Sequence, residues 1–461
     1  MQEHREKYAW LNWGVRLLPF TDAVSEDLPL SRLLRLSLFQ VSVGMALVLL
    51  VGTLNRVMIV ELGVPTSLVA VMVGLPLLFA PFRALVGFRS DHHRSQLGWR
   101  RVPYIWMGTL LQFGGFAIMP FALLVLAGWG QSQQAPAWVG HFATAVAFLL
   151  VGAGLHTTQT AGLALATDLT TPDKQANVVG FMYVMMLVGM VGSALMFGDV
   201  LTDFSPARLV QVVQAAALIT LVLNSVAMWK QESRSRHRKP GQGEDPSFLQ
   251  AWQLFTRDAD ALRRLWVVAL GTLAFSMEDV LLEPYGGEIL KLSVASTTQL
   301  TATLAMGSLI GFATASRLLS RGADPFRMAG AGCVCGLPAF MLGVGAAYAP
   351  EPAVWFSAGT FLIGLGAGLF GHGTLTATMN RASKEQAGLA MGAWGAAQAT
   401  AGGLAMALGG ILRDVVATIS SAWTGYCFVY SIEWLLLLAT LWAMRPLLGA
   451  AVSPHPVTGA P

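Results

Sequence analysis

Twelve apolar segments run through this chain of 461 residues, and they restrict its possible folds more than any other feature. Each is close to the ~20 residues that an α-helix needs to cross the hydrocarbon core of a bilayer. The composition agrees, because 54% of the residues are hydrophobic and only 12% are charged, against about 25% charged in soluble domains. We therefore expect an all-α polytopic membrane protein, with transmembrane helices at 36–60, 66–88, 102–127, 138–163, 177–199, 208–229, 264–288, 296–319, 326–349, 353–378, 386–411 and 424–446.

The positive charges predict an orientation. All but five of the 29 lysines and arginines lie in the two tails or in the loops on the same side of these spans. Positive charge collects on the cytoplasmic side of inner-membrane proteins, so both termini are expected in the cytoplasm. The first 30 residues are polar and mixed in charge, so no cleaved signal peptide is expected.

The sequence also contains an internal repeat of six spans. GAGL occurs at 152–155 and again at 366–369, and NRVMIV at 55–60 aligns without gaps on EDVLLE at 278–283. Two parallel six-helix repeats are the architecture of the major facilitator superfamily. The stretch GFRSDHHRSQLGWRR, which begins at residue 87, resembles the signature loop of that superfamily.

The repeat divides the chain into five expected regions. A polar, basic linker joins the halves, and it carries an amphipathic helix that lies either at the membrane surface or on the protein's own cytoplasmic face. The regions are a cytoplasmic N-terminal segment 1–35, an N-terminal six-helix half 36–229, the linker 230–263, a C-terminal six-helix half 264–446 and a cytoplasmic tail 447–461.

Three acids, Glu278, Asp279 and Glu283, lie inside the seventh span, where each costs roughly 2.5 to 3.5 kcal/mol. The repeat sets Arg56 opposite Asp279 and Asn55 opposite Glu278. In this architecture the first spans of the halves face each other across the central cavity. We therefore hypothesise an Arg56–Asp279 ion pair that ties the halves together or gates the cavity. The alternative is that each residue separately meets backbone or headgroups.

The seventh span is also expected to be broken. Asp279 and Glu283 are four residues apart and share a helical face. Pro284 and the glycines at 286–287 are expected to interrupt the helix directly after them. A broken span beside acids is a common way to build a polar site at membrane depth. Proton coupling or ligand binding by a carboxylate fits this pattern, and a structural hydrogen-bond network is the alternative.

Two histidines, His156 and His372, lie well within spans. A buried neutral imidazole can ligate a metal, including the magnesium of a chlorin, but it can also simply hydrogen-bond across helices. Arg83 is expected to reach the interface or to pair with Asp91. The sequence has no phosphate-binding loop, hydrolase elbow, metal-spaced Cys/His cluster or nucleic-acid-binding module, so we expect neither an enzyme nor a resident metal nor a nucleic-acid partner.

Several of these segments resemble a known family. They are LNRVMIVELGVPTSLVA, FRALVGFRSDHHRSQLGWRRVPYIWMGTLLQFGG, AGLALATDL and above all MEDVLLEPYGGEIL, at residues 277–290. They resemble the bacteriochlorophyll delivery family of the major facilitator superfamily, the PucC/LhaA-type assembly proteins. The similarity runs from about residue 30 to residue 446.

The resemblance implies a role in assembling light-harvesting complexes in the bacterial inner membrane and intracytoplasmic photosynthetic membrane. The implied partners are the antenna α and β polypeptides, bacteriochlorophyll as cargo or its biosynthetic enzymes, and membrane lipid. A cavity with a histidine and carboxylates is compatible with a magnesium chlorin, and the candidate ligands are His156, His372, Glu278 and Glu283. The likeness to the PucC branch favours the peripheral antenna as the client.

Two other functions stay open. A proton-coupled transporter of a small amphipathic solute would use the same acids of the seventh span. A scaffold without transport would bind only protein. An assembly factor is expected to co-purify with pigment or antenna peptides, whereas a transporter is expected to show pH-dependent uptake into vesicles.

Overall fold

The computed structural model describes residues 28–80, 82–92, 98–128, 134, 136–171, 175–203, 205–232, 259–381 and 387–448. Every regular element within these ranges is helical, and eleven helices there are long and apolar enough to cross a membrane. The predicted all-α polytopic architecture is therefore confirmed. The amphipathic helix expected in the linker falls mostly on 233–258, which lies outside the described residues.

The N-terminal half begins with two irregular spans. The first runs without interruption through α3 (Leu30–Leu47), η2 (Val48–Thr53), α4 (Leu54–Arg56) and η3 (Val57–Glu61), of which η2 and η3 are π-helical. The second is split into α5 (Thr66–Gly74), the 3-10 turn η4 (Leu75–Phe79) and α6 (Phe82–His92). The remaining spans are α7 (Val102–Leu126), α8 (Ala137–Asp168), α9 (Gln175–Val200) and α10 (Pro206–Met228).

The split explains why no single long helix covers the expected span 66–88. Pro76 lies within η4, and a proline inside a helix removes one backbone hydrogen bond and clashes with the carbonyl four residues back. The chain therefore crosses this region as two short helices and a tighter turn.

The C-terminal half also begins with an irregular span. It consists of α12 (Ala259–Ser276), the 3-10 turn η6 (Glu278–Val280) and α13 (Leu282–Glu288). The other spans are long helices, namely α14 (Val294–Ser320), α15 (Pro325–Gly345) with the short turn η7 (Ala346–Tyr348), α16 (Pro352–Arg381), α17 (Ala387–Ile419) and α18 (Ala422–Leu448).

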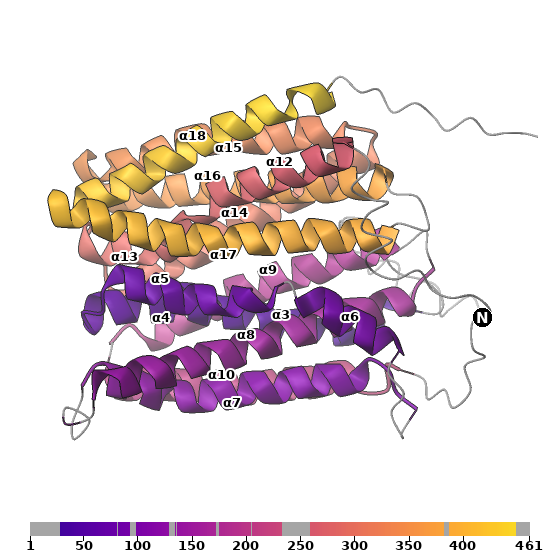
Figure 1. Cartoon of the computed structure of the whole chain (residues 1–461), viewed down its shortest axis with the longest axis horizontal. Helices are drawn as coiled ribbons and strands as arrows, with labels where there is room; N and C mark the ends of the chain where they lie inside the picture. Colours follow the sequence, from indigo (N-terminus) through magenta and orange to yellow (C-terminus); the bar gives the residue numbers. More distant parts are fainter. Residues whose placement is uncertain are drawn as a thin grey trace, which may run out of the picture.

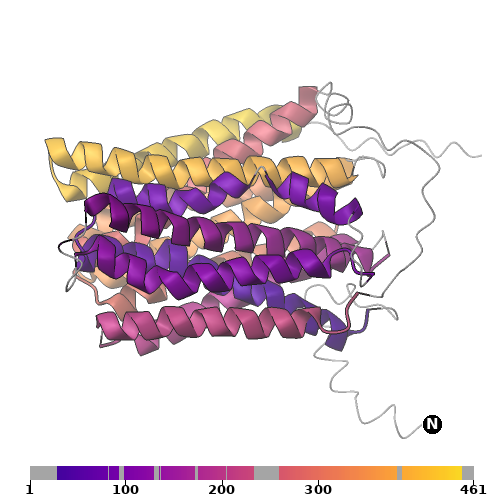
Figure 2. The same ribbon diagram turned by 60° about the horizontal axis from the view of Figure 1, so that its bottom comes forward.

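The two halves lie side by side with their helices roughly parallel to one axis (Figures 1 and 2). One apolar core belongs mostly to the N-terminal half and a second mostly to the C-terminal half. Between them, α9 packs on α14 and α5 packs on α17. The α5–α17 contact is close, because a Cβ atom built at Gly410 would lie 2.2 Å from the Cβ of Ala70.

Large apolar side chains are exposed on the outside of the bundle, for example Trp266 and Trp442. In water such exposure would be costly, whereas it is what a lipid-facing surface requires. Two ends of the bundle are distinguished below. The linker end is the end at which α3 begins and α10 finishes, and the opposite end is the one at which the chain turns between Glu61 and Thr66.

Candidate functional site

The seventh span is broken beside its acids, but the break lies before Pro284 and not after it. Helix α12 stops at Ser276, a 3-10 turn covers Glu278–Val280, and α13 begins at Leu282 and continues through Pro284 and the two glycines. The expected position of the break is therefore wrong. The physical reason is that a proline disturbs the turn that precedes it, where its ring meets the carbonyl four residues back, and is tolerated in the first turn of a new helix.

Two backbone groups of the broken turn find side-chain partners. The N–H of Glu278 donates to Oε1 of Glu433 in α18, over 2.6 Å. The carbonyl of Val280 would accept from residue 284 in a regular helix, but Pro284 has no N–H. Nδ2 of Asn55 in the N-terminal half donates to this carbonyl instead, over 2.6 Å. The break is thus held by one residue from each half.

The first spans of the two halves therefore meet, as the repeat predicts, although the individual partners differ. Asn55 was expected opposite Glu278, and it bonds two residues further along, at Val280. Arg56 was expected to pair with Asp279, and this prediction is wrong, since its guanidinium forms an ion pair with Glu61. Residues 57–61 form a π-helix, in which residues five apart follow one another along the same side. That geometry brings Glu61 to Arg56.

The Arg56 side chain still reaches the other half. Its Nη2 lies 3.5 Å from the carbonyl oxygen of Leu292. A Cβ atom built at Gly287 would lie 3.2 Å from Nε of Arg56. The guanidinium therefore rests on the glycine of α13, and it is buried there.

Glu283 is a second link between the halves. It is buried, and its carboxylate accepts hydrogen bonds from Thr301 and, over 3.4 Å, from Thr298, both in α14. On the other side it lies against the backbone of Gly52, where an added Cβ would come within 2.4 Å of Oε1. Glycine in the π-helical stretch η2 is what allows the carboxylate to approach.

A cluster of charged and polar residues joins the halves at the opposite end. Arg413 pairs with Glu288 and, over 2.9 Å, with Asp414, and it lies 4.7 Å from the ring centre of Tyr426. The Tyr426 hydroxyl donates to Glu288 over 2.8 Å. The N–H of Ser67, at the start of α5, donates to Asp414. Charged residues thus close the α5–α17 contact at this end.

The carboxylates of Glu278 and Glu433 form a buried acid pair deep in the C-terminal half. Both side chains are fully buried. Among the described residues, neither oxygen of Glu278 and only one of the two oxygens of Glu433 has a hydrogen-bond partner. The rings of Tyr285 and Tyr430 lie nearby, with their centres 5.9 Å apart. This pair is a candidate site for a proton or for a ligand that donates hydrogen bonds.

Sequence reasoning missed Glu433, although a signal was present. It is the one acidic residue in the expected span 424–446, and an intramembrane acid is a functional candidate by default. Asp279, in contrast, is only half-buried.

His156 lies on the face of α8 that meets the broken second span. Gly152, one turn earlier, packs so closely that a Cβ there would lie 2.4 Å from Pro76. Thr160, one turn later, accepts a 3.1 Å hydrogen bond from Nε of Arg83. His156 is buried between these contacts, and its Nδ1 has no partner among the described residues. Arg83 is therefore fixed to α8, and the side chain of Asp91, its expected partner, lies outside the described residues.

The four predicted pigment ligands have separate surroundings. His156 faces the second span, Glu283 is enclosed by Gly52 and two threonines, and Glu278 lies beside Glu433. His372 stacks on Phe312, with ring centres 4.1 Å apart. Over the described part of the chain, no three His, Cys, Asp or Glu residues are arranged to hold a metal ion.

Comparison with known proteins identifies the family. The family described as PUCC protein matches residues 53–452. The chain belongs to the PucC family. Protein PucC of Rhodovulum sulfidophilum is 62% identical over 429 residues, which cover 91% of this chain and 94% of that protein. Protein PucC of Rhodobacter capsulatus is 57% identical over 441 residues, which cover 94% and 95%.

A solved structure supports the fold. The crystal structure of a D-xylose–proton symporter superposes with a TM-score of 0.68 at 12% identity, covering 90% of this chain and 96% of the symporter. At this identity the likeness concerns the fold alone. The PucC-family chain is thus a multi-pass membrane protein with a major facilitator fold.

Proposed function

We propose that this PucC-family protein is an assembly factor for light-harvesting antenna complexes. In this proposal it binds bacteriochlorophyll, or delivers it to the antenna α and β polypeptides, in the intracytoplasmic photosynthetic membrane with both termini in the cytoplasm. The observation that carries the proposal is family membership over residues 53–452. It supports a role in photosynthetic complex assembly or in bacteriochlorophyll handling without specifying the step.

His156 is the residue that we propose as ligand to the magnesium of the pigment. A buried imidazole nitrogen without a partner in the described part of the chain is available as an acceptor, and neutral imidazole is a common metal ligand. Its surroundings are the interrupted second span, where the helix is divided at Pro76. Glu283 is a weaker candidate, because two threonines already donate to its carboxylate.

An absorption spectrum tests this proposal. The protein is purified in mild detergent from a host that makes bacteriochlorophyll but lacks antenna polypeptides. We expect a near-infrared band that follows the protein through size-exclusion chromatography and weakens in His156→Ala. His141→Ala is the matched control, because this histidine is exposed on the same helix, α8. A colourless wild-type protein, or a band that is unchanged in His156→Ala, contradicts pigment ligation by this residue.

A proton-coupled transporter of a small amphipathic solute is the second candidate. The buried pair of Glu278 and Glu433 favours it, because neither carboxyl group has an ion-pair partner among the described residues, and such a group in the membrane is suited to take up and release a proton. This function predicts pH-dependent uptake into vesicles that is lost in Glu278→Gln. Pigment binding without such uptake would leave the assembly factor as the sole candidate.

A further inference from the structure

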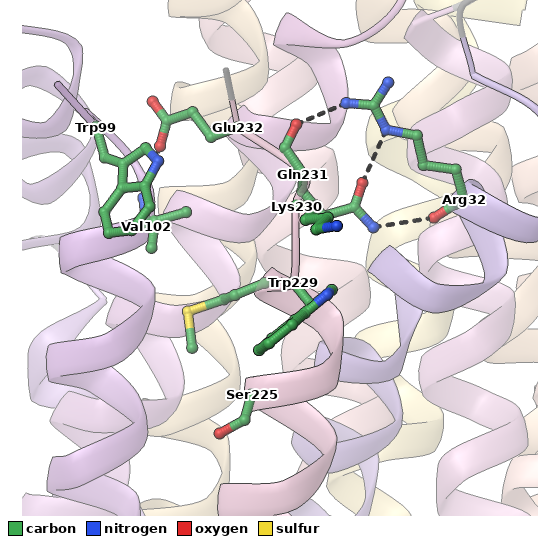
Figure 3. A pocket seen from close by; sticks show the side chains of 9 residues that line it. Arg32, Trp99, Val102, Ser225, Trp229, Lys230, Gln231 and Glu232 are labelled. Atoms are coloured by element: carbon green, nitrogen blue, oxygen red, sulfur yellow. Dashed lines mark hydrogen bonds between the residues drawn. The ribbon is translucent and has the colours of Figure 1, made fainter. Parts of the chain in front are cut away.

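A basic pocket lies at the linker end of the N-terminal half, away from the contact between the halves. Its main cavity, of about 510 Å³, lies between the start of α3, the start of α7 and the end of α10. A second cavity of about 280 Å³ is lined by Ser31, Arg32, Arg35 and Lys230. The two cavities share Arg32 and Lys230 as lining residues, and Figure 3 shows the residues that line the main cavity.

The walls of the pocket are held by the segment that leaves α10. Arg32 donates from Nε to the side-chain oxygen of Gln231, over 3.1 Å, and from Nη2 to its carbonyl, over 2.6 Å. The Gln231 amide donates back to the Arg32 carbonyl over 3.2 Å. Figure 3 shows these bonds on one side of the pocket, with Trp99 and Glu232 on the other. The pocket is therefore a built feature of the fold.

The charge of the lining favours an anion. Three cations, Arg32, Arg35 and Lys230, face one acid, Glu232. The carboxylate of Glu232 accepts hydrogen bonds from the backbone N–H groups of residues 100–102, before and at the start of α7. These bonds hold it on that side of the pocket. Nε of Arg35 is buried and has no partner among the described residues. Among the described residues that line the two cavities, three cations therefore stand against one carboxylate.

Trp229, an exposed residue that lines the main cavity, continues an exposed apolar face of α10. Leu218, Val222, Val226 and Trp229 follow this face towards the cavity, with exposed fractions of 58%, 59%, 42% and 64%. Such a stripe is suited to acyl chains, and a tryptophan at its end is typical of the level of the headgroups. A free anion in solution would contact only the basic pocket. A lipid would contact the pocket with its headgroup and the apolar face of α10 with its acyl chains.

We propose that this pocket binds the phosphate-bearing headgroup of an anionic phospholipid, with the acyl chains lying along the exposed face of α10. Basic pockets between transmembrane helices on the cytoplasmic side recognise such headgroups by charge, and the linker end is the one that the positive-charge bias assigns to that side. Arg35 and Lys230 supply the charge, while Arg32 and Gln231 position the segment that carries Lys230. The inference is independent of pigment binding.

Lys230 offers a clean test. It adopts a left-handed backbone conformation, with φ of 53°, which glycine adopts without strain. Lys230→Gly therefore removes the ammonium group without straining the backbone. Arg35→Ala removes the second cation, and Arg321→Ala is the control, because it removes an exposed arginine at the end of α14 in the other half.

The experiment measures binding of phosphatidylglycerol and phosphatidylcholine, with identical acyl chains, to the delipidated full-length protein by native mass spectrometry. We expect wild type and Arg321→Ala to prefer phosphatidylglycerol. Lys230→Gly and Arg35→Ala should each bind it about fivefold more weakly, and phosphatidylcholine should bind equally to all. If Arg35→Ala does not accumulate, Lys230→Gly alone decides. Equal binding of both lipids by wild type, unchanged binding in Lys230→Gly, or full competition by glycerol phosphate overturns the proposal.

Discussion

The first spans of the two halves align without a gap, yet their backbones differ. In the N-terminal half the chain stays helical from Leu30 to Glu61 and only widens into two π-helical stretches. In the C-terminal half the equivalent span stops at Ser276 and starts again at Leu282. The repeat therefore determines which segments meet. The buried polar groups determine whether each span stays helical or is broken.

The two spans also complement each other at their contact. The broken span presents a carbonyl, at Val280, that lacks an N–H partner within its own helix. The unbroken span presents the Asn55 amide that satisfies it. The broken span presents the Glu283 carboxylate, and the unbroken span presents a glycine, Gly52, that makes room for it. Two features of the broken span, the Val280 carbonyl and the Glu283 carboxylate, are thus matched by residues of the unbroken span.

Enlarging Gly52 is expected to have the largest effect on this contact. Gly52→Val inserts atoms where an added Cβ would already lie 2.4 Å from Glu283 and 2.9 Å from Thr301. We expect a loss of about 3 kcal/mol in the free energy of unfolding, at the upper end of overpacking costs, measured by unfolding in mixed micelles. Gly192→Val is the control, because no atom lies within 4 Å of a Cβ there. Equal losses in both variants would contradict the close contact.

Removing the acceptor from Glu433 is expected to have the next largest effect. Glu433→Leu leaves the buried N–H of Glu278 without a partner, which costs about 1–3 kcal/mol. Glu433→Gln keeps a side chain of the same length with an acceptor oxygen, so it serves as the matched control. The quantity to compare is the difference in unfolding free energy between the two variants. A leucine variant as stable as the glutamine variant would show that this bond does not hold the break.

Asn55→Ala removes the hydrogen bond between the halves, and a smaller loss is expected. Interhelical hydrogen bonds in membranes contribute about 0.6 kcal/mol on average and up to about 1.7 kcal/mol. Because the Val280 carbonyl has no N–H from residue 284, we expect a value near the upper figure, measured in the same assay. Asn224→Ala is a useful comparison, because Asn224 bonds Ser42 and Thr109 within the N-terminal half. If Asn55→Ala is as stable as wild type, the bond from Asn55 to Val280 does not stabilise the contact between the halves.

Pro284→Ala gives the smallest expected change and the sharpest test. The alanine supplies the missing N–H to Val280, so the loss or gain in stability should stay within about 1 kcal/mol. In that background Asn55→Ala should cost less than in wild type, because the carbonyl has a second donor. A double-mutant cycle measures this coupling. Strictly additive effects would mean that the proline does not create the unsatisfied carbonyl.

Much of the architecture could be predicted from the sequence, because its signals are local. The length of the apolar segments predicts the spans, and the alignment of 55–60 on 278–283 predicts that these two segments meet. The resemblance carried by MEDVLLEPYGGEIL, at 277–290, predicts the family that the comparison confirms. A proline and neighbouring acids also predict an interruption of the seventh span, although not its exact position.

The partners of the buried polar groups were decided only by the tertiary structure. Glu278 meets Glu433 from 155 residues away, and Asn55 meets Val280 from 225 residues away. The repeat predicts that residues 55–60 and 278–283 meet, but it does not predict which of their atoms bond, and it gives no signal for the contact of Glu278 with Glu433. Arg56 pairs with Glu61 and not with Asp279, because the π-helical turn at 57–61 places Glu61 on the same side of the helix as Arg56. The sequence alone determined which helices form and which halves they build, because the length of the apolar segments and the prolines act locally. Packing decided which polar groups bond to one another at membrane depth.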